Sequence, residues 1–136
     1  METADMSNIA LYQEMFRHFG AGDMAGVRKL IHPDIRMENM APANSPISGD
    51  RVGIDAFIAY LDIAGENTAS YEFLRAERYF ESGEVVVALG REKFTIKSTG
   101  KTMETPFAHE SHWCDGRLVL WREYYDSAKL QDAWTP

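Results

Sequence analysis

The sequence contains a single cysteine, Cys114, so no disulfide can form within one chain. Scarce cysteine suits a reducing compartment, and the acidic first ten residues have no apolar segment of the kind found in secretory signals. We therefore expect a cytoplasmic protein. No apolar run approaches the roughly 20 residues that cross a bilayer, so we expect no contact with a membrane.

Basic residues are also few. The 14 lysines and arginines are outnumbered by 21 aspartates and glutamates, which gives a net charge of −7, and the longest basic run is the pair Arg28 and Lys29. Proteins that bind nucleic acids normally present clustered basic residues to the phosphates. We therefore expect no nucleic-acid partner.

The composition that remains is typical of one globular domain. A chain of 136 residues, 45% hydrophobic and 26% charged, can bury a core without disulfides or metals. The sequence has no internal repeats and no low-complexity segment. We therefore interpret residues 1–136 as a single domain.

Hydrophobic periodicity divides the chain into a helical first part and a strand-rich second part. Apolar residues recur at helical spacing over 7–19, 24–31 and 51–64. A short extended piece at 35–40 and a loop rich in proline, serine and glycine at 41–49 separate the second and third of these helices.

Four extended runs follow, separated by turn signals; they span 71–80, 85–97, 103–113 and 118–126. Asp-Gly between two apolar runs is a strong hairpin signal, so we expect an antiparallel meander, followed by a short tail over 127–136. Helices segregated from an antiparallel sheet make an α+β fold. To shelter a core, the sheet must curve strongly around the three helices, and the resulting cone encloses a pocket suited to a ligand.

Four segments, in this order, resemble the SnoaL-like and ketosteroid-isomerase-like branch of the nuclear-transport-factor-2-like (NTF2-like) superfamily. They are FGAGDMAGVRKLIHPDIRMEN at 19–39, SGDRVGIDAF at 48–57, STGKTMETPFAHESHWCDGRLV at 98–119 and REYYDSAKL at 122–130. The resemblance implies the cone fold, which hosts isomerases, cyclases, hydrolases, dehydratases and binding proteins.

For function, the resemblance implies acid/base chemistry on a small apolar oxygenated molecule such as a polyketide, a steroid-like compound or a terpenoid. The enzyme would be a cofactor-independent isomerase or cyclase, or a hydrolase like limonene-epoxide hydrolase. The alternative is a non-catalytic domain that binds a ligand or a partner in the same cone. No metal and no organic cofactor is implied.

The resemblance also indicates three candidate catalytic residues. Asp126 resembles the acid that handles a proton at the end of the last strand in epoxide hydrolases and polyketide cyclases, although an aspartate before Ser-Ala-Lys equally suits a helix N-cap. His109 resembles the cavity histidine of SnoaL-like proteins, which donates to an oxyanion or relays a proton. Asn39 stands where ketosteroid isomerases carry their base. It resembles instead an asparagine that orients water in epoxide hydrolases, or it bonds the backbone of the nearby loop.

One position departs from the epoxide-hydrolase pattern. Those enzymes carry an arginine two residues before the position of His109, and this chain has Phe107 there, so their complete set is absent.

Alternation along the run 103–113 separates its two histidines. Side chains three apart on a strand face opposite sides, so His109 and His112 cannot both point into the pocket. The inner set is predicted to be Phe107, His109, Ser111 and Trp113. Neighbouring side chains diverge, so a metal site built from 109, 110 and 112 is not expected.

The same alternation on the last run predicts a pocket face and an outer face. The pocket face is Arg122, Tyr124 and Asp126, with the first two as substrate-binding residues, and the outer face is Trp121, Glu123 and Tyr125. Families with this fold commonly dimerise through the outer face of the sheet, so the resemblance implies a homodimer. Tyr12 and Phe16 on the first helix either roof the pocket or pack in the core.

Overall fold

The computed structural model describes residues 6–136, with the backbone alone at positions 71 and 73–75. The start of the N-terminal segment, on which the absence of a secretory signal was predicted, lies outside the described residues. Along the chain the elements are α1 (Asn8–Gly20), α2 (Met24–Lys29), β1 (Ile31–Asn39), β2 (Gly49–Val52), α3 (Ile54–Glu66), β3 (Thr68–Ser82), β4 (Val85–Ile96), β5 (Thr102–Cys114), β6 (Arg117–Tyr125) and α4 (Ser127–Trp134).

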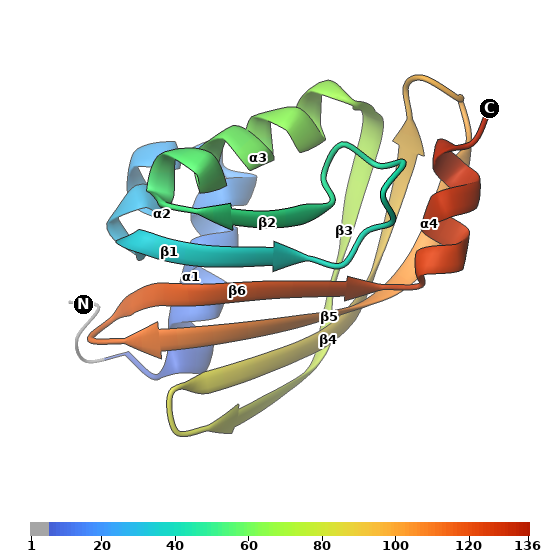
Figure 1. The fold of residues 1–136 in the computed structure, drawn as a ribbon. Helices are drawn as coiled ribbons and strands as arrows, with labels where there is room; N and C mark the ends of the chain where they lie inside the picture. The colour runs from blue at the N-terminus through green and yellow to red at the C-terminus, as the bar shows by residue number, and fades with distance from the viewer. Residues whose placement is uncertain (1–5) are drawn as a thin grey trace.

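The strands form one sheet in the order β2-β1-β6-β5-β4-β3. Neighbouring strands are antiparallel except β1 and β6, which are parallel. The long strands bend strongly around α1 and α3 (Figure 1). A cone-shaped α+β fold with a strongly curved, mainly antiparallel sheet is therefore confirmed.

Strands β3, β4 and β5 approach closely at a glycine of β4. A Cβ added at Gly90 of β4 would lie 2.6 Å from the ring of Phe107 and 2.8 Å from the Cα of Ala76. Only a residue without a side chain lets the neighbouring strands and the Phe107 ring pack this closely.

The first two helices begin at side-chain caps. Ser7 accepts a hydrogen bond from the N–H of Ala10, and Asp23 accepts one from the N–H of Gly26, so each satisfies a donor that a helix start leaves without a partner. The buried positions Leu11, Tyr12 and Met15 of α1 recur at spacings of three and four and form its core face.

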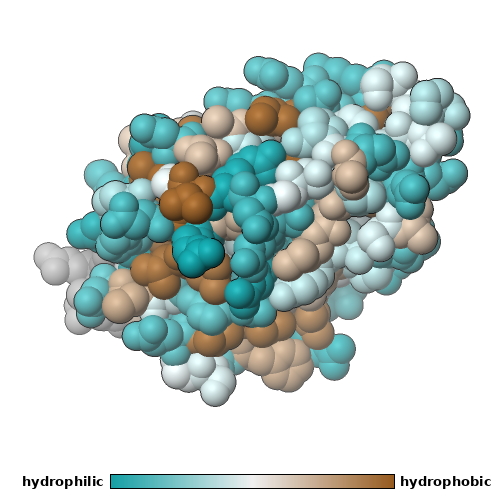
Figure 2. Space-filling view, in the orientation of Figure 1, coloured by the Kyte–Doolittle hydropathy of each residue, from teal (hydrophilic) through white to brown (hydrophobic). Residues whose placement is uncertain are grey.

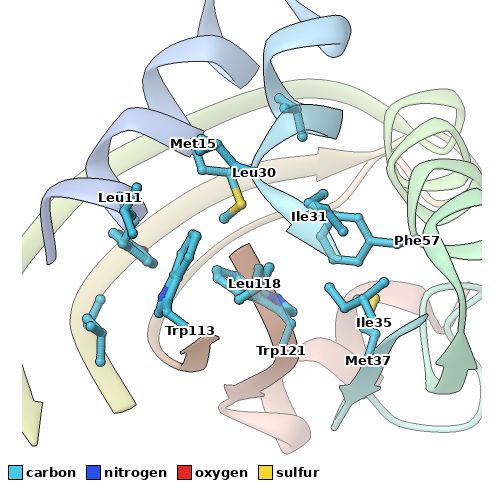
Figure 3. Close-up of a cluster of buried hydrophobic side chains, with 14 of the residues drawn as sticks. Leu11, Met15, Leu30, Ile31, Ile35, Met37, Phe57, Trp113, Leu118 and Trp121 are labelled. Carbon is cyan, nitrogen blue, oxygen red and sulfur yellow. The ribbon is translucent and has the colours of Figure 1, made fainter. Parts of the chain in front are cut away.

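Two clusters of buried side chains make up the interior. The first lies between the first three helices and the sheet and contains Leu11, Met15, Phe57, Trp113 and Trp121 among others (Figure 3). The second lies under α4 and contains Phe94, Ile96, Met103, Leu130 and Ala133. Outside these clusters, the face shown in Figure 2 is mostly hydrophilic, with apolar residues in separate patches. No helix in the described part of the chain is long and apolar enough to cross a membrane.

Two elements differ from the prediction. Residues 49–52 form β2, which pairs with β1, where a loop and a helix start were expected; Gly49 and Gly53 flank it with φ angles of 98° and 97°. The predicted tail is the helix α4, because Leu130 and Ala133 lie three residues apart and both pack into the second cluster.

A β-bulge interrupts the hairpin between β5 and β6. The turn residues Asp115 and Gly116 have φ angles of 51° and 79°, as expected of the two-residue turn that Asp-Gly favours. Trp113 pairs with Leu118, but the preceding His112 pairs with residue 120, so Val119 is an extra residue in β6. One inserted residue moves every later side chain of a strand to the opposite face.

Candidate functional site

A cavity of about 230 Å³ lies between the helices and the concave face of the sheet. Its wall is mainly apolar, with Phe16, Phe57 and Phe94 among the lining side chains. The ionisable side chains that line it are Tyr60, Glu92, His109, Glu123 and Tyr125. Mainly apolar cavities with a few convergent polar groups are typical ligand sites.

Glu123 is the carboxylate that the bulge turns into the cavity, and only 8% of the residue is exposed. Its Oε1 accepts hydrogen bonds from Trp121 Nε1 at 2.7 Å and from the Tyr60 hydroxyl at 3.1 Å, and its Oε2 accepts one from the Tyr125 hydroxyl. All three donors are electrically neutral. A carboxylate offers about four lone-pair sites, so Oε2 can accept one further hydrogen bond or a proton.

The two tyrosines act as donors because they hold their protons. Burial raises the pKa of both Tyr60 and Tyr125 well above its usual value, and the negative charge of Glu123 raises it further. Asn39, itself buried, donates from Nδ2 to the Tyr125 hydroxyl at 3.1 Å and to the Tyr60 hydroxyl at 3.4 Å. Its Oδ1 accepts from the N–H of Ala41 at 2.9 Å, which is the backbone bond considered from the sequence. The geometry makes Asn39 a positioning residue for the donors of Glu123.

His109 lies directly opposite Glu123 on the neighbouring strand. Its Nδ1 is 2.8 Å from the Tyr12 hydroxyl, and its buried Nε2 has no hydrogen-bond partner among the described residues. Burial lowers the pKa of His109 from 6.5 to about 4, against the opposing charge of Glu123, so the ring is neutral at neutral pH. Among the described side chains, the Tyr12 hydroxyl makes no other hydrogen bond, so we assign it as the donor to Nδ1, which leaves the proton of the imidazole on Nε2.

Aromatic rings hold the imidazole of His109 in one orientation. The Phe107 ring stacks on it at a centroid distance of 4.1 Å and an angle of 19°, and the Phe16 ring lies nearly parallel to it at 5.7 Å. The Trp121 ring approaches at 4.7 Å. These contacts restrict rotation of the ring, so its Nε2–H is a preorganised donor.

Glu92 is a second buried carboxylate in the wall, 5% exposed, and sequence reasoning missed it. On β4 it belongs to the row of inward positions that also contains Val86, Ala88, Gly90, Phe94 and Ile96. Alternation from Phe94 and Ile96 is the signal that places this glutamate inside.

Alternation on β5 was predicted correctly, and alternation on β6 was wrong. The four inner residues predicted on β5 are all buried. On β6, Arg122 and Tyr124 lie on the outer face, where Arg122 bonds the carboxylates of Glu38 and Glu110, and the Tyr124 hydroxyl lies 3.4 Å from Glu110. The cause is the bulge, which was not foreseen. It also turns Trp121, Glu123 and Tyr125, expected on the outer face, into the interior.

Asp126 does not line the cavity. It is the N-cap of α4, where its side chain accepts a hydrogen bond from the N–H of Lys129 at 3.2 Å. Its predicted pocket position was therefore wrong, and its alternative interpretation as a helix cap is confirmed. The carboxylate inside the cavity is Glu123, three residues earlier.

The other predicted pocket residues lie at or behind the wall. Phe16 lines the cavity, while Tyr12 and Phe107 pack directly against His109. Trp113 is buried away from the cavity and donates from Nε1 to the Ser111 hydroxyl at 2.9 Å. No group of three or more histidine, cysteine, aspartate or glutamate side chains is placed to hold a metal ion in the part of the chain that the structure describes.

Comparisons with known proteins agree with this architecture. A family model described as SnoaL-like domain matches residues 12–121. No curated protein matches the chain. Among solved structures, an NTF2-like protein from Burkholderia xenovorans is 24% identical over 94% of this chain and 95% of its own, with a TM-score of 0.86.

Two further structures share the fold. TerC, co-crystallised with polyporic acid, is 20% identical over 93% of this chain and 97% of its own, with a TM-score of 0.81. A putative SnoaL-like polyketide cyclase from Jannaschia sp. is 20% identical over 97% and 98% of the two chains, with a TM-score of 0.80. Because the family model covers residues 12–121, the chain belongs to the SnoaL-like domain family, and it shares its fold with NTF2-like proteins.

Proposed function

We propose that this protein binds a small, mostly apolar ketone in the cavity and moves a proton at the carbon next to the carbonyl group. One observation carries the proposal. Glu123 and the neutral His109, whose Nε2 has no hydrogen-bond partner among the described residues, lie side by side on neighbouring strands and line one mainly apolar cavity. A carboxylate beside a neutral hydrogen-bond donor is the pair of groups that abstraction of such a proton needs.

In the proposed step, the Nε2–H of His109 donates to the ketone oxygen. Oε2 of Glu123 takes a proton from the adjacent carbon, and the electrons of the broken C–H bond form the C=C bond of an enolate. The negative charge passes to the oxygen, where the hydrogen bond from His109 stabilises it. Return of the proton to a different carbon is an isomerisation, and attack of the enolate carbon on a second carbonyl is an aldol-type cyclisation.

The similar structures support a ligand of this class. One is named a putative polyketide cyclase, and another was co-crystallised with polyporic acid. Hydrolysis of an epoxide receives less support, because Asp126, the acid of that pattern, caps α4.

A second candidate function is ligand binding without turnover. It is favoured by the three hydrogen bonds that Glu123 already accepts, since a carboxylate with most of its lone pairs occupied also suits a purely orienting role.

Proton exchange distinguishes the two functions. 1-Tetralone, a two-ring ketone with exchangeable protons next to the carbonyl, is dissolved in D₂O with the protein, and the loss of those protons is followed by NMR. The proposal expects an exchange rate well above that of buffer alone. Saturable binding of 1-tetralone and related ketones without accelerated exchange contradicts catalysis and leaves the binding function.

We also propose that a second copy of the chain packs on the outer face of the sheet. Tyr124 is 38% exposed on that face, beside the ion pairs of Arg122 with Glu38 and Glu110. Light scattering coupled to size-exclusion chromatography is expected to give twice the mass of one chain, and Tyr124→Asp is expected to lower it. A wild-type mass equal to one chain at high concentration contradicts the proposal.

A further inference from the structure

The cavity has a second polar end that the proposed proton transfer does not use. Trp134, the last residue of α4, lines the cavity, and its Nε1 is buried without a hydrogen-bond partner in the described part of the chain. Glu92 lines the same cavity and is 5% exposed. An indole N–H only donates and a carboxylate accepts, so the two groups together offer both kinds of hydrogen bond.

These groups lie away from the reacting pair. Trp134 packs against the second buried cluster, which contains Phe94, and Glu92 lies two residues before Phe94 on the same face of β4. Glu92 pairs with Thr105 of β5, whereas His109 is four residues further along β5, roughly 13 Å in strand length. The backbones of Glu92 and His109 therefore lie at two levels of the sheet, and the charge of Glu92 also raises the pKa of Tyr60 and Tyr125 beside Glu123.

A buried donor without a partner is costly, because it has lost its hydrogen bonds to water. Such an atom is explained when a ligand supplies the acceptor. His109 Nε2 and Trp134 Nε1 are the two buried side-chain atoms in this condition among the described residues. Both residues line the one cavity, so a single ligand can satisfy both.

We propose that the ligand is a small two-ring ketone that carries a hydroxyl group at the end opposite its carbonyl. The carbonyl oxygen binds at His109, and the hydroxyl group binds between Glu92 and Trp134, beneath α4. This assignment rests on the proposed function for the carbonyl end alone. The size follows from the volume, since about 230 Å³ is below the roughly 300 Å³ at which cavities for larger ligands begin.

A hydroxyl group of the ligand can both donate and accept a hydrogen bond at this second site. Its O–H donates to the Glu92 carboxylate, a group with about four lone-pair sites that also has contacts within the protein, and its oxygen accepts the N–H of Trp134. A hydrogen bond to a charged acceptor in a water-excluded site is stronger than one between neutral groups.

The test compares two probes that differ by this hydroxyl alone, 6-hydroxy-1-tetralone and 1-tetralone. Dissociation constants are measured by isothermal titration calorimetry at mildly acidic pH, where the phenol is neutral. The hydroxylated probe is expected to bind wild type about tenfold more tightly. Glu92→Gln is expected to remove most of this preference, and Trp134→Phe is expected to reduce it about fivefold.

Glu104→Gln is the matched control, because Glu104 lies exposed on the outer face of β5 and bonds Arg91. It is expected to retain the wild-type preference. Thermal unfolding checks that each variant is folded, and the ratio of two dissociation constants on one protein is insensitive to its overall stability. Equal affinity of wild type for both probes, or a preference unchanged in both cavity variants, overturns the proposal.

Failure here is distinguishable from failure of the proposed function. Accelerated exchange of 1-tetralone without a preference for the hydroxylated probe leaves proton transfer standing and removes the second site. A hydroxyl preference without exchange of either probe supports the second site in a protein that binds and does not turn over its ligand.

Discussion

Two carboxylates, one on each face of the sheet, accept hydrogen bonds from different kinds of donor. Glu123 on the inner face accepts from Trp121, Tyr60 and Tyr125, all neutral. Glu110, on the outer face, bonds Arg122 at 2.9 Å and His112 at 2.6 Å.

The charge of the hydrogen-bond donors determines the electrostatic environment of each carboxylate. The hydrogen bond to His112 and the guanidinium of Arg122 lower the pKa of Glu110 and so favour its charged form in contact with solvent. Neutral donors orient Glu123 without neutralising its charge, in a buried and mainly apolar site, where electrostatic interactions are stronger than in water. The hydrogen bonds of the inner carboxylate are compatible with the proposed proton transfer, whereas those of the outer one form surface ion pairs.

The largest effect on activity is expected from a change to the inner carboxylate. Glu123→Gln keeps the shape of the side chain but removes the proton acceptor, so exchange of 1-tetralone is expected to fall by at least about 100-fold. Glu110→Gln, the matched outer change, is expected to leave the exchange rate within about twofold. NMR rates for both variants check this, and equal losses would mean that the two faces are not functionally distinct.

A second experiment compares the histidines of the two faces. The folded-state pKa of His109 is about 4 and its ordinary value is 6.5, so between these values the unfolded chain binds more protons than the folded one. The contribution of His109 to the free energy of unfolding is therefore fully present above pH 6.5, and it falls by about 3 kcal/mol as the pH drops to about 4.

Urea unfolding across this pH range measures the effect. His109→Asn is expected to flatten the pH dependence, whereas His112→Asn on the outer face is expected to retain most of it. A His109→Asn curve parallel to wild type would show that the buried ring is not the group that resists protonation.

A third change separates the helix cap from the inner acid. Asp126→Ala removes the side-chain acceptor for the N–H of Lys129, and the free energy of unfolding is expected to fall by about 1 kcal/mol. Exchange of 1-tetralone is expected to fall far less than in Glu123→Gln. A loss as large as that of Glu123→Gln would restore Asp126 as the acid predicted from the sequence.

The smallest effect is expected on the outer face itself. Arg122→Gln removes the ion pairs with Glu38 and Glu110, whose side chains all reach solvent, so the cost is expected to stay below about 1 kcal/mol and to shrink in high salt. Chemical denaturation at two salt concentrations measures it. A larger, salt-independent loss would show that the outer network is more than surface pairing.

The sequence allowed most of the fold to be predicted, because its signals are local. Helical spacing in α1, the Asp23 cap and the Asp115-Gly116 turn each act within a few residues. The short strand β2 was missed because its pairing with β1 spans a long loop. The helix α4 was missed because its two core contacts, Leu130 and Ala133, are too few to show a period.

The site was predicted only in part. His109 was placed inside because alternation on β5 is regular up to the turn. The positions of Glu123 and Tyr125 were not predicted, because the bulge changes which side chains of β6 point inward. The position of Tyr60 was not predicted, because it depends on how α3 packs against the sheet. Glu92 has a usable signal in the alternation of β4, but its charge and its charged neighbours Arg91 and Lys93 are typical of a solvent-exposed stretch.

The extra residue Val119 determines on which face of the sheet each later side chain of β6 lies. The turn fixes where β6 begins, and the bulge then decides which side chains of WREYYD point toward the cavity and which toward the outer face. Deletion of Val119 would exchange the two sets, presenting Arg122 and Tyr124 to the cavity and Trp121 and Glu123 to the outside. Alternate residues of this one segment thus form the cavity wall and the outer face, and the single residue Val119, which precedes the segment, determines which residues form which.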